Sequence, residues 1–418
     1  MDAHKPLTIG LFGFGVVGEG LYRVLQQTPS LKATIKKVCI KHPGKKRQAP
    51  DELFTTDRNE LLFDPAINVI VEVINESEVA FEIVSTALKN GKDVVSASKK
   101  MIAENLPELL GLQKQTGHSL LYEAAACASI PVIRNLEEYY DNDLLHSIKA
   151  IVNGSTNFIL TKMFSDKLDF QQALLQAQQL GFAESDPTLD VEGYDAVNKW
   201  AFLLTHAYGI VEHPAKIVFN GIQNIGQFDA TAAAEKHYDI KLVAQAKKLA
   251  NGKVAAFVLP QFVKQDDHLA FVKHEYNGVV IESGFADKQF FYGKGAGSFP
   301  TASAVLSDLS ALRYQYKYEY KKLYHHNKHE LTNDFYVRVY VSFDDLQFIP
   351  KERFEWVEEW HSETDRKYLV GVIPFSELQN NNWWRSNNTS LILTPDPIIE
   401  DMEIRKLKKK SLELAGIL

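Results

Sequence analysis

One short segment near the N-terminus constrains the fold more than any other part of the sequence. It reads Gly13-Phe14-Gly15-Val16-Val17-Gly18. The apolar run Leu7–Phe12 comes directly before it, and the amphipathic run Val16–Gln27 carries on from it. A glycine turn between a strand and a helix lets the backbone approach a pyrophosphate at a helix N-terminus, where free amide groups attract anions. The motif in this position therefore predicts a dinucleotide-binding domain of the Rossmann type.

The rest of the first third alternates apolar and amphipathic segments. Further strands are predicted at residues 36–41, 68–74, 93–97 and 119–123, and helices between them, one of them near residues 106–115. This alternation is typical of a doubly wound parallel sheet. From about Pro131 the texture changes, because the strand-like residues 146–152 are followed by mainly helical sequence up to Tyr208. We therefore expect a second domain of α+β type and a small C-terminal α+β segment.

The C-terminal segment has three features of its own. Residues 335–343 alternate apolar and polar side chains and predict a strand. The charged run 353–361 predicts a helix, and the basic tail 405–410 predicts a solvated helix end.

Composition excludes several classes of protein. A formal net charge of −7 gives no electrostatic footprint for nucleic acid. There is no apolar run long enough to cross a bilayer and no signal-peptide core at the N-terminus. The only cysteines are Cys39 and Cys127, too few for a disulfide framework or a cysteine-based zinc site. These properties favour a protein of the reducing cytoplasm.

The end of the second predicted strand bears on the choice of cofactor. A carboxylate there binds the ribose hydroxyl of NAD, whereas a cation accommodates the 2′-phosphate of NADP. The strand ends in Ile40-Lys41-His42, without an acid, and Lys45, Lys46 and Arg47 follow. This pattern favours NADP. NAD stays as the alternative, because lysines in loops are commonly just solvated.

A cluster of charged side chains marks the middle of the chain. It consists of Glu184, Asp186, Asp190, Glu192, Asp195 and Lys199. Asp195 and Lys199 are four residues apart on a helix predicted at residues 195–208, so they share a face. A surface ion pair would be the simple interpretation. However, the apolar run 200–204 indicates that part of this helix is buried, and so many carboxylates need a cationic group to offset their repulsion. The cluster therefore favours a binding or catalytic site.

Three further segments are candidates for ligand contact. Lys99 follows the fourth predicted strand, at the sheet edge where ligands bind, and a solvated lysine is the equal alternative. The segment Asn153-Gly154-Ser155-Thr156-Asn157 is either a helix N-cap or a set of donors for a substrate carbonyl. The glycine-rich residues 293–297 allow a close backbone approach to a ligand.

In this order, these elements resemble the homoserine dehydrogenase family. The run from Glu184 to Lys199 carries the resemblance most specifically, and the likeness extends over about residues 7–315. The resemblance implies reversible, NAD(P)-dependent hydride transfer between L-aspartate 4-semialdehyde and L-homoserine, in the biosynthesis of threonine, methionine and isoleucine. It also implies a homodimer. No aspartate kinase domain precedes residue 7, so the chain resembles the monofunctional enzyme.

The resemblance also implies roles for individual residues. Lys199 would donate and accept the proton of the substrate oxygen, with Asp195 near the reacting hydroxyl and Lys99 in contact with substrate and cofactor. The residues expected to bind substrate are Glu184, Asp190, Asn153, Gly154 and Ser155. The residues expected to bind the cofactor are Gly13, Phe14, Gly15, Val16, Val17, Gly18, Lys41, Asn75, Ser96, Lys99 and Gly295.

Family members also bind a monovalent cation such as Na⁺ or K⁺ through one glutamate and backbone carbonyls. The corresponding residues are Glu123, Ala126, Ala128 and Ile130. The sequence departs from the family pattern here, because residues 126–129 replace a glycine-richer stretch. It also departs at Ser98, where asparagine is usual, and at Asn75-Glu76, which replaces a glycine pair.

The resemblance suggests boundaries for the domains. A dinucleotide-binding domain spans 1–131 and is completed by 296–318, and a substrate-binding and dimerisation domain spans 132–295. Residues 319–418 resemble a degenerate regulatory module of the ACT type. Its characteristic strand-to-helix turn is missing at residues 342–346, so feedback by threonine is not supported.

Two other functions stay open at this point. One is another semialdehyde or amino-acid oxidoreductase, such as an aspartate-semialdehyde dehydrogenase, which needs a cysteine nucleophile, here Cys127. The other is a non-catalytic, NADP-binding regulator. The alanine-rich segment around Cys127 predicts a buried side chain, which disfavours the first, and the intact acidic residues and Lys199 disfavour the second.

Overall fold

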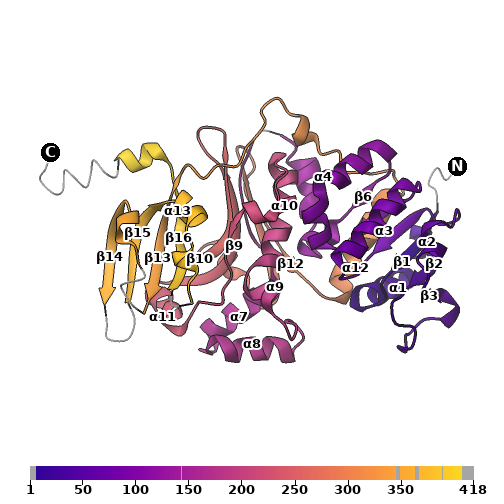
Figure 1. Cartoon of the computed structure of the whole chain (residues 1–418), viewed down its shortest axis with the longest axis horizontal. Helices are drawn as coiled ribbons and strands as arrows, with labels where there is room; N and C mark the ends of the chain where they lie inside the picture. Colours follow the sequence, from indigo (N-terminus) through magenta and orange to yellow (C-terminus); the bar gives the residue numbers. More distant parts are fainter. Residues whose placement is uncertain (1–5, 143, 345–348, 363–366, 388, 407–418) are drawn as a thin grey trace, which may run out of the picture. The chain divides into compact units, whose positions relative to one another are not determined.

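The computed structural model describes residues 6–142, 144–344, 349–362, 367–387 and 389–406. The chain divides into two compact units (Figure 1). The first unit contains residues 1–143, 198–214 and 292–328, and the second contains residues 144–197, 215–291 and 329–418. Within the described ranges, no helix is long and apolar enough to cross a membrane.

The first unit is built on a six-stranded sheet in the order β3-β2-β1-β4-β5-β6, and every pairing in it is parallel. Its strands are β1 (Leu7–Phe12), β2 (Ala33–Cys39), β3 (Phe54–Thr55), β4 (Val69–Glu72), β5 (Asp93–Ser96) and β6 (Leu120–Leu121). The order runs outward in both directions from β1 and β4, so the crevice for a ligand lies at the carboxyl ends of these strands. The predicted Rossmann-type fold is confirmed.

The helices of the first unit flank this sheet (Figure 1). They are α1 (Val16–Gln27), α2 (Asn59–Leu62), α3 (Ser77–Lys89), α4 (Lys99–Thr116), α5 (Glu123–Cys127), α6 (Val132–Arg134) and α12 (Ser298–Leu312). Helix α12 returns from far along the chain to pack on α1. A Cβ on Gly20 would lie 2.4 Å from the Ser298 hydroxyl, which itself donates to the carbonyl of Val16 at 2.7 Å. This close approach attaches residues 292–328 to the dinucleotide-binding sheet.

Helix α4 is longer than expected, because it begins at Lys99 rather than near residue 106. Pro107 lies inside it, where a proline costs one helical hydrogen bond. The apolar face of Met101, Leu106 and Leu109 is buried and outweighs that loss. Lys99 therefore opens a helix instead of lying in a loop.

The second unit contains a ten-stranded sheet in the order β12-β11-β7-β9-β10-β16-β13-β15-β14, with β8 beside β10. Its strands are β7 (Leu145–Ile151), β8 (Val218–Phe219), β9 (Tyr238–Lys248), β10 (Val254–Lys264), β11 (Tyr276–Ser283), β12 (Asp287–Lys294), β13 (Tyr336–Phe343), β14 (Trp356–Ser362), β15 (Lys367–Pro374) and β16 (Thr389–Ile399). Its helices are α7 (Gly154–Ser165), α8 (Phe170–Gln179), α9 (Thr188–Val191), α11 (Gln227–Glu235), α13 (Ser376–Asn380) and the start of α10 (Tyr194–Tyr208).

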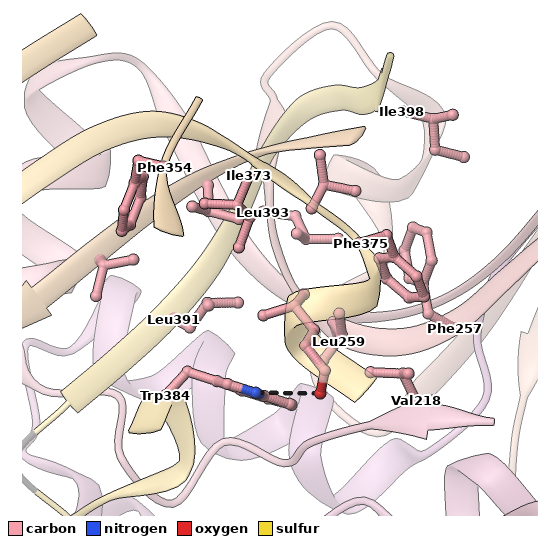
Figure 2. Close-up of a cluster of buried hydrophobic side chains, with 14 of the residues drawn as sticks. Val218, Phe257, Leu259, Phe354, Ile373, Phe375, Trp384, Leu391, Leu393 and Ile398 are labelled. Carbon is pink, nitrogen blue, oxygen red and sulfur yellow. Dashed lines mark hydrogen bonds between the residues drawn. The ribbon is translucent and has the colours of Figure 1, made fainter. Parts of the chain in front are cut away.

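The C-terminal strands belong to this same sheet. Strand β16 pairs with β10 in parallel at Gln261 and Leu393, and β13 pairs with β16 and β15. Figure 2 shows the core that both parts share, in which Phe257 and Leu259 pack with Trp384 and its neighbours. The buried indole of Trp384 donates to the carbonyl of Leu378 at 3.2 Å. Continuity of sheet and core makes the described residues between 329 and 399 an extension of the second unit.

The helix predicted at residues 353–361 is wrong, because this run forms the edge strand β14. It pairs antiparallel with β15, and two of its acidic side chains form ion pairs with cations of β13 and of the end of α11. Glu358 lies 3.1 Å from the Arg338 guanidinium, and Glu359 lies 2.6 Å from the Lys236 ammonium. Charged side chains are common on edge strands, where they discourage pairing with other chains. Residues 407–410 of the predicted tail and 345–346 of the strand-to-helix turn lie outside the described residues.

Candidate active site

The glycines of the N-terminal turn are needed for different physical reasons. Gly13 has a φ of +96°, and a Cβ on it would lie 2.9 Å from the carbonyl oxygen of Val73. A Cβ on Gly18 would lie 2.2 Å from the carbonyl oxygen of Gly13, so these two glycines are needed by the fold itself. A Cβ on Gly15, the N-cap of α1, would meet no atom within 4 Å. Gly15 therefore leaves open space at a helix N-terminus, where a phosphate can approach.

A cavity of about 670 Å³ adjoins this turn. It lies at the carboxyl ends of β1, β2 and β4, the edge at which parallel sheets bind dinucleotides. Its lining comes from residues 12–15, 39–42, 45, 47, 56–59, 74, 76, 79 and 83. The predicted contacts Gly13, Phe14, Gly15 and Lys41 are therefore brought together around one cavity.

The cations at this cavity are engaged in different ways. The ammonium of Lys41 lies 2.5 Å from a carboxylate oxygen of Glu76. The guanidinium of Arg47 donates to the carbonyls of His42 and Lys45 at 2.6 and 2.7 Å, so it holds its own loop together. Lys45 also lines a neighbouring cavity of about 820 Å³, together with Lys46 and Arg47.

Ser96 and Lys99 lie at the end of β5 and the start of α4. The Ser96 hydroxyl donates to Glu72 at 2.5 Å and accepts from the amide of Ser98 at 3.1 Å. Ser96 is buried, so it shapes the turn that leads to Lys99, whose side chain is exposed. Asn75 is exposed in the loop after β4.

Glu72 was missed by the sequence reasoning. It ends β4 fully buried, and its carboxyl group accepts from the amide of Ile74 at 2.7 Å as well as from Ser96. Burial raises the pKa of this carboxyl to about 7, although the two hydrogen bonds work against that rise. In the sequence, a glutamate in an apolar strand resembles a polar residue on a solvent-exposed face. No local pattern shows that both faces of β4 are covered.

This pKa leads to a prediction about stability. Because the folded-state pKa of Glu72 lies above its usual value of 4.5, the folded protein binds the proton more tightly, and its free energy of unfolding falls as pH rises from about 4.5 to 7. Glu72→Gln cannot ionise; its amide oxygen can still accept from the amide of Ile74, and its amide nitrogen can donate to the Ser96 hydroxyl. We expect it to reduce the loss of stability between pH 5 and pH 8 by about 1–3 kcal/mol in urea unfolding. Glu78→Gln, on the exposed first turn of α3, is the control. A Glu72→Gln variant with the wild-type pH dependence would contradict the assignment.

The acidic cluster of the second unit is organised by Asn153. This residue is the N-cap of α7, and its side-chain oxygen accepts from the amide of Thr156 at 2.8 Å. Its amide nitrogen donates to Asp190 at 2.7 Å and to Asp195 at 2.8 Å. Asn153 and Asp195 are buried. One asparagine therefore caps a helix and holds two carboxylates side by side, and such a pair suits a cationic group of a ligand.

The neighbouring predicted residues have other contacts. A Cβ on Gly154 would lie 2.5 Å from the carbonyl oxygen of Glu275, so the backbone itself requires glycine there. The Ser155 hydroxyl donates to the carbonyl of Phe182 at 2.5 Å and holds the loop that leads to Glu184. Glu184 is exposed in that loop, and the structure shows no bond from its side chain to the Asn153 group.

Helix α10 carries the two remaining predicted residues. It spans Tyr194–Tyr208, close to the predicted 195–208. Asp195 lies in its first turn and Lys199 one turn later, so the two side chains share a face. Both are buried. The helix continues from the second unit into the first, and Lys199 belongs to the first.

Glu123 lies in a buried network of the first unit. Its two carboxylate oxygens accept from the amides of Ile133 and Arg134 at 2.8 and 3.0 Å, and its own amide donates to Asp308 at 3.0 Å. The Arg134 guanidinium also donates to Asp308 at 3.0 Å. Burial raises the pKa of Glu123 to about 8, with Asp308 adding to the rise, and raises the pKa of Asp308 to about 6. The guanidinium of Arg134 thus pairs with Asp308, whereas Glu123 is held by backbone amides.

The backbone beside Glu123 has an unusual turn. Ala128 adopts a φ of +45°, a conformation that favours glycine, and the carbonyl of Ile130 accepts from the amide of Val132 at 2.9 Å. Cys127 is fully buried, which disfavours a role as a nucleophile. In the parts of the chain that the structure describes, no group of three or more His, Cys, Asp or Glu side chains could hold a metal ion. Gly295 lies between β12 and α12, where the preceding carbonyl of Lys294 accepts from the Ser129 hydroxyl at 3.0 Å.

Comparison with known proteins accounts for both units. Residues 13–123 match the family model of the homoserine dehydrogenase NAD binding domain, and residues 131–310 match that of homoserine dehydrogenase. The chain is 36% identical over 317 residues to the homoserine dehydrogenase of Bacillus subtilis, covering 74% of this chain and 73% of that protein. It is 38% identical over 311 residues to that of Synechocystis, covering 72% of each.

Solved structures give the same result. A homoserine dehydrogenase from Thiobacillus denitrificans superposes with a TM-score of 0.82 at 26% identity, covering 94% of this chain and 99% of that one. A hyperthermophilic archaeal homoserine dehydrogenase in complex with NADPH superposes with a TM-score of 0.64 at 27% identity, covering 75% of this chain and 99% of that one. The family predicted from the sequence is confirmed: this chain belongs to the homoserine dehydrogenase family of NAD(P)-dependent oxidoreductases.

Proposed function

We propose that this chain interconverts L-aspartate 4-semialdehyde and L-homoserine with NADP, using Lys199 as the proton donor and acceptor. The observation that carries the proposal is the arrangement of Asn153, Asp190 and Asp195, with Lys199 one turn after Asp195 on α10. The nicotinamide ring supplies the hydride when the cofactor is bound. Everything else in the reaction falls to side chains of this chain.

The proposed chemistry balances with one proton transfer. A hydride added to the aldehyde carbon leaves an alkoxide, which the Lys199 ammonium protonates to give the alcohol. In the oxidative direction, neutral Lys199 takes the hydroxyl proton as the hydride leaves. Glu184 and Asp190 provide the negative charge for the substrate ammonium, and Asp195 lies near the reacting hydroxyl. Lys99, at the start of α4, is assigned to substrate and cofactor contact by its place in the family pattern.

Asn153 offers a sharp test of the substrate site. Asn153→Ser keeps a side chain able to cap α7 but removes the amide that donates to Asp190 and Asp195. We expect the KM for L-homoserine to rise about tenfold or more, because the two carboxylates lose their shared donor and repel each other. The KM for the cofactor should stay within about twofold, since Asn153 belongs to the other unit. Steady-state kinetics with each substrate varied separately will measure both values. A KM for homoserine like that of wild type would remove Asn153 from the site.

The preference for NADP rests on the charges at the cofactor cavity. No acid stands at the end of β2, and Lys41 and Lys45 line the cavity there. The archaeal relative described above was solved with NADPH. The test is the ratio of kcat/KM for NADP and for NAD during oxidation of L-homoserine, followed at the nicotinamide absorbance band. A ratio below one would overturn the preference, and no turnover with either cofactor would overturn the reaction.

We also propose a monovalent cation at Glu123 and the carbonyls of Ala126, Ala128 and Ile130. Glu123 and Asp308 are both buried, and the Arg134 guanidinium donates to Asp308, so the carboxylate of Glu123 fits an added positive charge. Because a cation competes with the proton on Glu123, we expect Na⁺ or K⁺ to raise the unfolding temperature more at pH 9 than at pH 6. Choline chloride at equal ionic strength is the control, and Glu123→Gln should abolish the difference. Equal unfolding temperatures in all three salts at pH 9 would exclude the site.

Two properties complete the proposal. We assign the chain to the cytoplasm and to a homodimer, on the grounds of its family. Light scattering coupled to size-exclusion chromatography will give the mass in solution, and a value near that of one 47.2 kDa chain would contradict the dimer.

A further inference from the structure

A carboxylate lies at the cofactor cavity although the sequence has none at the end of β2. Glu76 precedes α3 as its N-cap and lines the cavity beside Lys41. Its carboxylate oxygen lies 2.5 Å from the Lys41 ammonium, and the two residues are 35 positions apart. Both side chains are more than half exposed, at 53% for Glu76 and 68% for Lys41, so both can meet a ligand in the cavity.

The position of this pair matters for cofactor choice. In a doubly wound sheet, the residue just after the second strand contacts the 2′ position of the adenosine ribose. Lys41 occupies that place, two residues beyond the end of β2. Glu76 lies in the loop between β4 and α3, and its carboxylate lies against the same ammonium. It can therefore supply, from a different loop, the acid that is absent after β2.

We infer that Glu76 is a specificity-determining residue that, together with Lys41, contacts the 2′ position of the cofactor's adenosine ribose. This inference rests on the proposed function, because it concerns the same cofactor cavity. A 2′-hydroxyl can donate to the Glu76 carboxylate while Lys41 stays paired. A 2′-phosphate brings negative charge against that carboxylate and has to draw Lys41 away from it. Glu76 thus favours NAD and limits the advantage that the lysines give to NADP.

The other charged groups of the cavity do not replace this pair. Arg47 donates to carbonyls of its own loop, and Arg58 lies 2.7 Å from Glu82. Asp57 lines the cavity from the segment after β3, and its side chain accepts from the amide of Asn59 at 2.8 Å. Among the described residues that line the cavity, Lys45 is a second lysine that can meet a 2′-phosphate beside Lys41. The balance between the two cofactors therefore depends on whether Lys41 faces Glu76 or the phosphate.

The test compares Glu76→Gln with Glu78→Gln. Both remove one negative charge at the start of α3, but Glu78 does not line the cavity. For Glu76→Gln we expect the ratio of kcat/KM for NADP to that for NAD to rise about three- to thirtyfold, with the NAD value falling. Glu78→Gln should leave the ratio within twofold of wild type. A ratio that is unchanged or lower in Glu76→Gln would overturn the inference.

Two further measurements separate this inference from the proposed function. If wild type prefers NAD, the proposed NADP preference fails, yet Glu76→Gln must still move the ratio toward NADP. If no cofactor supports turnover, nicotinamide fluorescence gives the dissociation constants of NADPH and NADH for the same comparison. In a Lys41→Ala background, Glu76→Gln should change the ratio by less than in wild type, because the two side chains act as a pair. An equal change of the ratio in both backgrounds would show that Lys41 does not act together with Glu76 in cofactor discrimination.

Discussion

Lys199→Met is expected to lower kcat for L-homoserine oxidation by about 10²–10⁴-fold. Lys199 is the one buried ammonium group that the proposed chemistry uses for proton transfer. Methionine has a side chain of similar length and flexibility, so it fills the buried space on α10 without the charge. The thermal unfolding temperature should therefore change little, and the loss should lie in the chemical step.

The measurement is the initial rate at saturating cofactor and L-homoserine, with circular dichroism to verify folding. Lys114→Met is a matched control, because it removes an exposed lysine from the last turn of α4 in the same unit. It should keep the wild-type rate. A folded Lys199→Met variant within tenfold of wild type would show that another group moves the proton.

Gly15→Ala is expected to raise the dissociation constant of NADPH about tenfold or more while leaving the unfolding temperature unchanged. The φ of Gly15 is −90°, which alanine adopts readily, and the added methyl group would meet no protein atom within 4 Å. The only cost is to a ligand that approaches the N-terminus of α1. Fluorescence titration with NADPH and a thermal melt will measure the two effects separately.

Gly18→Ala gives the opposite pattern and serves as the comparison. Its Cβ would lie 2.2 Å from the carbonyl oxygen of Gly13, so the turn itself has to move. We expect a lower unfolding temperature even without cofactor, because the strain is present in the free protein. If Gly15→Ala binds NADPH like wild type, the backbone of this turn does not contact the pyrophosphate. If Gly18→Ala melts like wild type, Gly18 is not a packing requirement.

Local features of this protein could be predicted from the sequence. The strand Leu7–Phe12 and the helix Val16–Gln27 are confirmed at both ends, because a glycine turn and a change of apolar period mark their boundaries. Helix α10 and the N-cap at Asn153 are also local patterns. The run that ends at Lys199 indicated the family. A fixed spacing of acidic residues can be recognised in the sequence alone, without knowledge of the fold.

Two predictions of secondary structure were wrong because they depended on tertiary contacts, which local sequence patterns do not show. The run 353–361 looks helical by charge, yet the free hydrogen-bonding edge of β15 makes it a strand. The sequence predicted a helix near residues 106–115, yet the buried face of α4 extends the helix back to Lys99. In both cases tertiary contacts outweighed intrinsic preference, because packing and strand pairing contribute more free energy than propensity does.

The sequence by itself determined the family, the cofactor-binding fold and the identity of the acidic residues and lysines. Only the tertiary structure decided which of them meet. Asn153 joins Asp190 to Asp195, Ser96 joins Glu72 inside the sheet, and Glu76 reaches Lys41 across 35 residues. The physical reason is that such contacts depend on which strands become neighbours, and strand order is set by the packing of the whole unit rather than by any segment of its sequence.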